Sequence, residues 1–290
     1  MIKINNKKIS NNEIKNQLIN MKNDKNIINN FWDNQSDKII NEFLNKNPKN
    51  FLKFKSIGET MFVGRRTKYI YLELINLIRY KNYFKKIKNL LFCNNFGKPA
   101  TFPINILFRN TNSNMIHQAY HLLKLKQETN INLDEIENIF EFGGGYGSLC
   151  KIFDNEGFKG NYYIYDLPLM SYIQNYWITN SNFINLKNIY LINDTENIPE
   201  IKNNIFGKKN LFISNWALSE SPIELRNKFT DFLKYFEYIS LAIQNNFQGV
   251  DNISYIDELK KDLLHSANMF LFEKKINHIK NSSYIYGMKI

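Results

Sequence analysis

A run of glycines follows an acidic residue near the middle of the chain. In EFGGGYG (141–147), the residues Glu141, Gly143, Gly145 and Gly147 stand at alternate positions. Glycines permit positive φ angles and let a ligand approach the backbone closely. Where a strand turns into a helix, such a loop also directs free N–H groups at the ligand. A tight turn without a ligand is the simpler interpretation of the glycines.

The leading acidic residue indicates which ligand the loop would bind. Dinucleotide-binding enzymes hold a pyrophosphate with the pattern G-x-G-x-x-G, but Ser148 stands at the third glycine position here. The carboxylate of Glu141 would repel a pyrophosphate and attract a cation. The methionyl ammonium group of S-adenosylmethionine is such a cation, so the motif favours that cofactor.

Two aspartates follow the next two expected strands. Asp166 ends the strand 162–166, and there its carboxylate would accept hydrogen bonds from both hydroxyls of a ribose. Asp194 comes just after the strand 189–192 and would meet the adenine amine. The alternatives are local: Asp166 would cap the helix that follows, and Asp194 would form an ordinary Asx turn.

These residues are positioned by an alternation of strands and helices after residue 135. We expect strands at 139–142, 162–166, 189–192, 211–214 and 238–243, with helices at 146–156, from 168, at 222–234 and at 254–266. This alternation is typical of a parallel sheet with helices on both faces. Two further strands, 269–274 and 284–289, are separated by about nine residues, too few for a helical crossover, so they should form an antiparallel hairpin.

The predicted fold class is therefore α/β, a doubly wound, Rossmann-like sheet of seven strands with an antiparallel last strand. This is the architecture of class I methyltransferases, whereas a dinucleotide-binding Rossmann domain would continue with parallel strands. The region before residue 135 is predicted to be mainly helical. Apolar residues keep helical spacing at 14–21 and 39–44, the segment 67–92 fits one long amphipathic helix or a pair, and Ser113 is a plausible cap of a helix at 113–127.

Three segments carry a resemblance to a known family. EFGGGYGSL (141–149), YIYDLP (163–168) and LFISNWALSE (211–220), in this order and spacing, resemble the sugar O-methyltransferases of bacterial surface-polysaccharide gene clusters. The resemblance covers roughly residues 95–290. It implies a class I fold, S-adenosylmethionine as the methyl donor and a sugar hydroxyl as the acceptor. Asn210 stands where Asp would be expected, and we expect its role to be structural.

The change of pattern near residue 135 divides the chain into two parts with different expected roles. Residues 135–290 would form the catalytic domain that binds S-adenosylmethionine. Residues 1–134 would cover the acceptor pocket, build a homodimer, or do both. The acceptor would be a sugar linked to a nucleotide or a lipid and destined for a surface polysaccharide.

Methyl transfer to a sugar hydroxyl needs a general base near the carboxyl ends of the strands, because the hydroxyl is a poor nucleophile at neutral pH. Glu220 and His121 are the candidates. The alternative for Glu220 is a carboxylate that favours the N-terminus of the next helix. His121 shares a helical face with His117, and the alternative for both is a partly buried structural role. No metal is expected, since the Glu of H-E-x-x-H and a third ligand are both missing.

Several other side chains are candidates for binding the cofactor or the acceptor. Trp216 follows the fourth strand and would pack near the sulfonium or stack on a sugar, unless it is a core residue. His117, Gln244 and Asp251 are expected on the acceptor side. Asp251 would also serve a divalent cation, but no cluster of carboxylates supports one. Arg109 would contact the diphosphate of a nucleotide-linked acceptor.

The composition excludes some classes of protein. With 290 residues, of which 43% are hydrophobic and 15% aromatic, the chain has enough apolar material for a large core and is not a disordered protein. No run of 18 apolar residues predicts a membrane span. The N-terminus lacks the apolar stretch of a secretory signal. Cys93 and Cys150 have neither disulfide-framework nor metal-ligand spacing, so a cytoplasmic location is expected.

The net charge of +11 leaves rival functions open. A basic chain suits anionic partners, but Asn, Lys, Ile, Tyr and Phe share A/T-rich codons, so solvated surface lysines are the first interpretation. A methyltransferase for RNA or another small molecule is one alternative, although no RNA-binding module is visible and no specific nucleic-acid partner is expected. A non-catalytic scaffold that keeps the fold is another.

Overall fold

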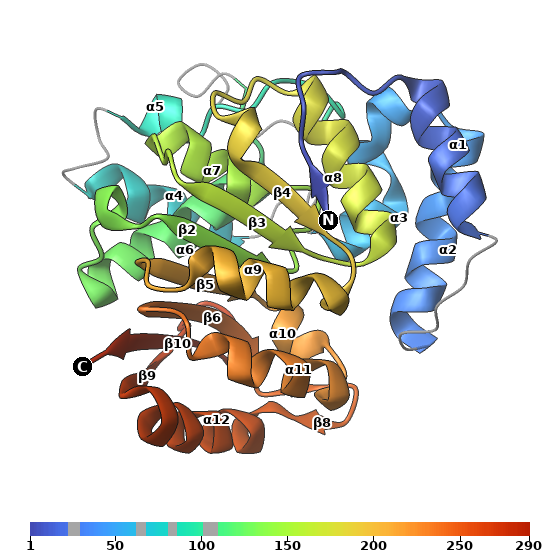
Figure 1. The fold of residues 1–290 in the computed structure, drawn as a ribbon. Coiled ribbons are helices and arrows are strands. Elements are labelled where there is room, and N and C mark those ends of the chain that lie inside the picture. Colours follow the sequence, from blue (N-terminus) through green and yellow to red (C-terminus); the bar gives the residue numbers. More distant parts are fainter. Residues whose placement is uncertain (23–29, 62–67, 81–85, 101–109) are drawn as a thin grey trace.

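The chain, described by a computed structural model at residues 1–22, 30–61, 68–80, 86–100 and 110–290, folds around a large mixed sheet (Figure 1). Its strands are β1 (Ile2–Lys3), β2 (Asn138–Phe142), β3 (Asn161–Tyr165), β4 (Ile189–Ile192), β5 (Asn210–Asn215), β6 (Tyr238–Gln244), β7 (Asn246–Phe247), β8 (Val250–Asp251), β9 (Met269–Lys275) and β10 (Ser282–Lys289). Strands β7 and β8 form a separate small hairpin.

The helices alternate with the strands in the second half of the chain and stand alone in the first. They are α1 (Asn11–Lys22), α2 (Asn30–Asn45), α3 (Lys55–Thr60), α4 (Lys68–Arg79), α5 (Ile87–Leu90), α6 (Ser113–Thr129), α7 (Ser148–Glu156), α8 (Pro168–Asn180), α9 (Ile198–Ile205), α10 (Ala217–Glu220), α11 (Ile223–Leu233) and α12 (Asn252–Ala267). Short 3-10 helices are η1 (Pro48–Lys53), η2 (Leu133–Glu135), η3 (Leu186–Asn188) and η4 (Thr195–Asn197).

The order of the strands defines the fold. Across the sheet it is β1-β4-β3-β2-β5-β6-β10-β9. The five strands from β4 to β6 are parallel. Strand β10 runs antiparallel to both β6 and β9, which confirms the predicted hairpin. A doubly wound parallel sheet that ends in this way is the class I methyltransferase fold predicted from the sequence.

The edge of the sheet and the start of α6 differ from the prediction, and helix α9 and the β7–β8 hairpin are absent from it. The sheet has eight strands instead of seven, because Ile2 and Lys3 pair antiparallel with β4 at its edge. Such a two-residue strand is too short to show any alternation of apolar and polar residues. Helix α6 is capped by Asn112 instead of Ser113: the Asn112 side chain accepts a hydrogen bond from the Met115 N–H, and Ser113 is already the first helical residue.

Two hydrophobic clusters cover the two faces of the sheet. Helices α9, α11 and α12 pack a phenylalanine-rich cluster on one face, and they lie together on one side of the sheet in Figure 1. Helices α7 and α8 and the N-terminal helices share the other cluster. Phe51 of the N-terminal region, for example, contacts the rings of Tyr146 and Tyr176, with centroids 6.3 and 6.2 Å apart. The change at residue 135 is therefore a change of secondary structure within one shared core.

The N-terminal helices are also tied to the second half of the chain by polar contacts. The hydroxyl of Tyr176 on α8 donates to Asn11 at the start of α1, over 2.6 Å.

Cys93 and Cys150 are buried free thiols. Among the described helices, none has the length and apolar character to cross a bilayer.

Candidate functional site

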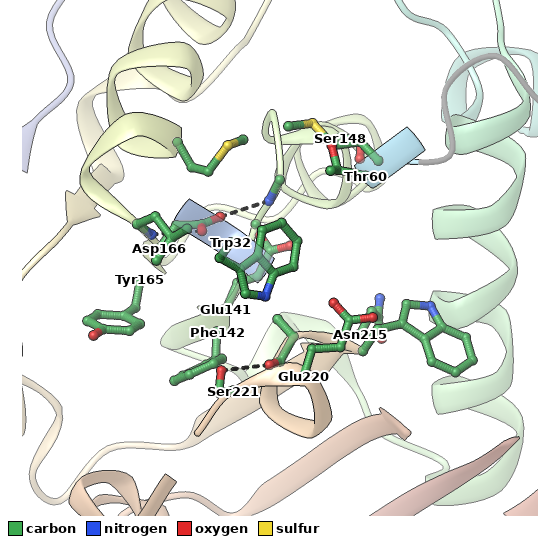
Figure 2. A pocket seen from close by; sticks show the side chains of 18 of the residues that line it. Trp32, Thr60, Glu141, Phe142, Ser148, Tyr165, Asp166, Asn215, Glu220 and Ser221 are labelled. Atoms are coloured by element: carbon green, nitrogen blue, oxygen red, sulfur yellow. Dashed lines mark hydrogen bonds between the residues drawn. The ribbon is translucent and has the colours of Figure 1, made fainter. Parts of the chain in front are cut away.

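A cavity of about 200 Å³ opens at the carboxyl ends of the parallel strands. Phe142, Tyr165 and Asn215, the last residues of β2, β3 and β5, all line it. Figure 2 shows Glu141, Asp166 and Glu220 around this cavity, with Trp32 drawn between Asp166 and Glu220. The structure therefore brings together the glycine loop and the carboxylates that the sequence placed on separate segments.

The glycine loop needs its glycines at the cavity wall for two different reasons. Gly143 has φ +82°, and a Cβ atom there would come within 1.9 Å of the Ala217 Cβ atom. Gly145 has φ +56°, while the nearest side-chain atom, in Met61, would lie 3.9 Å away, so the backbone conformation is the constraint at this position. Gly147 precedes α7, lies outside the cavity wall and faces Ile178 and Trp177 instead.

Glu141 lies inside β2 at the base of the cavity. Its side chain is buried and accepts a hydrogen bond of 2.9 Å from the Tyr162 hydroxyl. Burial raises the pKa of Glu141 to about 8, and the nearby carboxyl of Asp166 adds to the rise, while the Tyr162 hydrogen bond opposes it. A cation placed in the cavity would favour the ionised form of this carboxyl group.

Asp166 follows β3 and holds the glycine loop. Its carboxyl group accepts hydrogen bonds from the backbone N–H groups of Gly145, at 3.0 Å, and Leu167, at 2.8 Å, and from the Gln174 amide at 3.0 Å. Burial raises the pKa of Asp166 to about 7, against the effect of these hydrogen bonds. The Asp166 carboxyl thus joins the glycine loop to α8 at the edge of the cavity.

The turn after β5 supplies the opposite wall. Trp216 has φ +74° and ψ −41°, a conformation that is strained for any residue with a side chain. Its N–H donates to the Ala242 carbonyl on β6 at 2.8 Å, which holds the turn on the sheet. Glu220 ends the short helix α10, and burial raises its pKa to about 7, while a hydrogen bond of 3.4 Å from the Gln244 amide opposes that rise.

The two histidines of α6 are placed differently. His117 lines the cavity, and its ring stacks parallel to the Trp216 ring at 6.5 Å between centroids. Its Nδ1 lies 2.9 Å from Glu73 Oε1 on α4, and its Nε2 lies 3.1 Å from the Nε2 of His121. His121 is not part of the cavity wall. The pKa of His121 is held well below its usual value, mainly by burial and to a smaller extent by the neighbouring histidines.

These positions correct the expectation for His121, which sits behind His117 and does not reach the cavity. Glu73 also pairs with His278, whose Nε2 lies 2.8 Å from Glu73 Oε1. The group joins α4, α6 and the turn between β9 and β10. No set of three or more His, Cys, Asp or Glu side chains arranged to hold a metal ion occurs in the described part of the chain.

Other predicted site residues lie away from the cavity. Asp194 is exposed and caps η4 by accepting a hydrogen bond from the Glu196 N–H. This local contact agrees with the Asx turn expected from the sequence as the alternative to binding the adenine amine. Asp251 is exposed and caps α12 by accepting from the Ile253 and Ser254 N–H groups. Gln244 reaches the site only through its hydrogen bond to Glu220. Arg109 lies outside the described residues.

Several residues that line the cavity belong to no motif that could be recognised in the sequence. Trp32, Thr60 and Met61 come from the N-terminal helices, and Asn114 and Gln118 come from α6. The Asn114 amide donates to the Met61 carbonyl at 2.8 Å, and the Ser148 hydroxyl donates to Asn114 Oδ1 at 3.3 Å. Asn114 therefore ties the N-terminal helices to the start of α7, and only the tertiary structure reveals it.

Comparisons with known proteins give low similarities. No family model and no curated protein matches the chain. Among solved structures, the fibrillarin pre-rRNA processing protein of Methanococcus jannaschii has 14% identity and a TM-score of 0.40, covering 55% of this chain and 69% of its own. Human methyltransferase-like protein 13 in complex with SAH has 14% identity and a TM-score of 0.40, covering 60% and 82%.

A third similar structure, an O-methyltransferase family protein from Burkholderia thailandensis, has 9% identity and a TM-score of 0.39, covering 60% of this chain and 57% of its own. The assignment of the fold rests on the order and direction of the strands rather than on these likenesses.

Proposed function

We propose that this protein transfers the methyl group of S-adenosylmethionine to a hydroxyl group of a sugar. The observation that carries the proposal is the convergence of the carboxylate-led glycine loop, Asp166 and Glu220 on one cavity at the carboxyl ends of the strands. The acceptor would be linked to a nucleotide or a lipid, and the reaction would take place in the cytoplasm.

The residues on the glycine-loop side of the cavity fit a nucleoside with a cationic amino-acid arm. Glu141 is a buried carboxyl group that accepts a hydrogen bond from the neutral Tyr162 hydroxyl, and an ammonium group would neutralise it when it ionises. Asp166 would accept a hydrogen bond from a ribose hydroxyl through its remaining lone pair, because Gly145, Leu167 and Gln174 donate to the other three. Trp32, Thr60 and Met61 would cover the bound molecule from the N-terminal helices.

When bound, S-adenosylmethionine supplies an activated methyl group, so the chain has to align the acceptor oxygen and accept its proton. Glu220 suits proton transfer, because a carboxyl group with a pKa of about 7 can both take up and release a proton at neutral pH. The hydroxyl proton would pass to the Glu220 carboxylate and then to solvent. Asn215 and Gln118, which hydrogen-bond to each other at 2.9 Å, would offer amide groups to the other sugar hydroxyls.

Two measurements test the proposal. Calorimetric titration with S-adenosylhomocysteine is expected to give micromolar affinity, about −8 kcal/mol. Incubation with S-adenosylmethionine labelled at its methyl group and a panel of nucleotide-linked and lipid-linked sugars is expected to label at least one of them. A chain that binds no S-adenosylhomocysteine would overturn the proposal.

The net charge of +11 favours RNA as a second acceptor to test. Under the sugar proposal, any RNA binding is nonspecific, disappears at moderate salt and leads to no methyl incorporation. Saturable methylation of an RNA, retained at moderate salt, would establish RNA as the acceptor and refute the sugar assignment while keeping the cofactor.

A further inference from the structure

A fully buried arginine lies behind the turn that carries Glu220. Arg226 on α11 has no exposed surface. Its Nε donates to the Ser221 carbonyl and its Nη2 to the Ser219 carbonyl, both over 2.8 Å. The guanidinium group therefore binds the backbone on both sides of Glu220.

A buried asparagine completes this arrangement. Asn252, the first residue of α12, accepts a hydrogen bond from Arg226 Nη1 at 2.6 Å. Its own amide donates to the Ser219 carbonyl at 3.1 Å and to the Gln244 carbonyl at 2.8 Å. Gln244 is the residue whose side chain donates to Glu220. Asn252 thus holds both the Glu220 turn and the partner of the Glu220 carboxyl group.

Burial of an arginine needs an explanation, because a charge removed from water is costly unless its hydrogen bonds are satisfied. The guanidinium group of Arg226 donates to two backbone carbonyls and one amide oxygen rather than to a carboxylate. The Cζ atom of Arg226 also lies 5.0 Å from the centroid of the Tyr255 ring on α12. The fixed fork of a guanidinium can bind several backbone oxygens at once, which an apolar side chain of similar volume cannot do.

We propose that Arg226 and Asn252 are positioning residues for Glu220, which they hold with its carboxyl group in the cavity by fixing Ser219, Ser221 and Gln244. Neither residue lines the cavity, so each acts through the turn and not on a bound molecule. The inference rests on the role proposed above for Glu220 in accepting the proton of the acceptor.

The first test follows the ionisation of Glu220 and needs no acceptor. In protein labelled with ¹³C at the glutamate carboxyl carbon, the Glu220 signal is identified by its absence in Glu220→Gln. We expect a midpoint of about 7 in the unaltered chain. The other titratable groups on the cavity wall are Glu141, Asp166, Tyr165 and His117. Of these, only Glu141 carries the label, and its titration is recorded in the same samples.

The variants Arg226→Lys and Asn252→Ala are expected to lower that midpoint by about one pKa unit, because a released turn exposes the carboxyl group to water. A purely structural role would reduce the free energy of unfolding in both variants and leave the midpoint unchanged, which would overturn the inference. Arg226→Lys retains the charge and most of the volume, so it decides the question if Asn252→Ala does not fold.

Asn210→Ala is the matched control. Asn210 is also a fully buried asparagine, and its amide donates to the Ile205, Lys208 and Tyr235 carbonyls, but it lies at the opposite end of β5. We expect Asn210→Ala to lower stability without moving the Glu220 midpoint. An equal shift in this control would show that the midpoint reports general loosening of the fold, and would also overturn the inference.

A kinetic test follows once the sugar panel yields an acceptor. Arg226→Lys and Asn252→Ala should lower kcat by up to about a hundredfold, as expected for a misplaced catalytic group, with an unchanged affinity for S-adenosylhomocysteine. In a Glu220→Gln background, Arg226→Lys should cause no further loss, whereas losses that multiply would refute the coupling. If no member of the panel is methylated, the proposed function fails and the titration of Glu220 still tests the two positioning residues.

Discussion

Three carboxyl groups line the cavity, and burial raises the pKa of each: Glu141 to about 8, and Asp166 and Glu220 to about 7. Three buried carboxyl groups around one cavity would not favour the binding of a neutral or anionic molecule. The arrangement suits a cationic ligand, since binding it favours ionisation of carboxyl groups that are partly protonated at neutral pH.

Binding of S-adenosylhomocysteine should therefore release protons. Its ammonium group and ribose hydroxyls favour the ionised forms of Glu141 and Asp166, so the pKa values of both groups should fall in the complex. Affinity should therefore rise with pH between about 6 and 8. Calorimetry in two buffers that differ in ionisation enthalpy measures the protons released. Identical binding enthalpies in the two buffers would contradict the prediction.

A second prediction at this scale concerns substitution of the two carboxyl groups. Glu141→Gln and Asp166→Asn should each weaken binding of S-adenosylhomocysteine by about tenfold to a hundredfold, the usual contribution of a hydrogen bond to a charged group. Asp194→Asn is the control, because Asp194 lies outside the cavity and Asn is an equally good cap for η4. Equal losses in all three variants would mean that the cavity is not the binding site.

At the scale of elements, the buried Glu73 and His117 and the partly buried His278 join three segments that are far apart in the sequence. Removing one member of a buried ion pair leaves the others uncompensated, so Glu73→Ala should lower the free energy of unfolding by about 3 kcal/mol. Asp257→Ala, which breaks the exposed pair with Lys260, should cost less than about 1 kcal/mol. Urea unfolding at pH 7 compares the two variants. A similarly small decrease in the free energy of unfolding in both would show that Glu73 does not hold the three segments together.

The same group predicts how stability depends on pH. Although burial raises the pKa of Glu73, the two histidines outweigh that effect and hold it below its usual value. A group whose pKa is lower in the folded than in the unfolded chain stabilises the fold above the unfolded value of 4.5, and that contribution is lost as the pH falls through the folded value. Urea unfolding from pH 5 to pH 2 should therefore show a larger acid-induced loss in the unaltered chain than in Glu73→Ala.

The elements that local sequence patterns describe could be predicted, and those that depend on distant contacts could not. The strands around Glu141 and Asp166 and the hairpin of β9 and β10 follow from short apolar runs and loop length, and the structure confirms them. Asn210 holds three carbonyl groups, so its expected structural role is confirmed. Trp32 and Asn114 carry no local signal, because only the packing of the N-terminal helices on the glycine loop brings them to the cavity.

At the scale of the whole molecule, the N-terminal helices and the sheet share one hydrophobic cluster. Buried residues from α1, α2 and η1 pack in the same cluster as residues from α7 and α8. The first residues of the chain also add β1 to the sheet, and the Ile4 that follows them is buried. The helices therefore depend on the sheet for burial of their apolar faces, and the cavity depends on the helices for its cover.

This shared core predicts a single cooperative unfolding transition. Tryptophan fluorescence reports on Trp32 in the N-terminal helices as well as on Trp177 and Trp216 in the second half, while far-ultraviolet circular dichroism reports on all helices. Both signals should change at the same urea concentration, because the N-terminal helices pack in the same hydrophobic cluster as α7 and α8. Replacing Trp177 and Trp216 by Phe leaves Trp32 as the sole tryptophan, and the transition of its fluorescence should still coincide with the loss of helix. A Trp32 signal that changes at a clearly lower urea concentration would show that the N-terminal helices unfold first, and the cavity would then have a detachable cover.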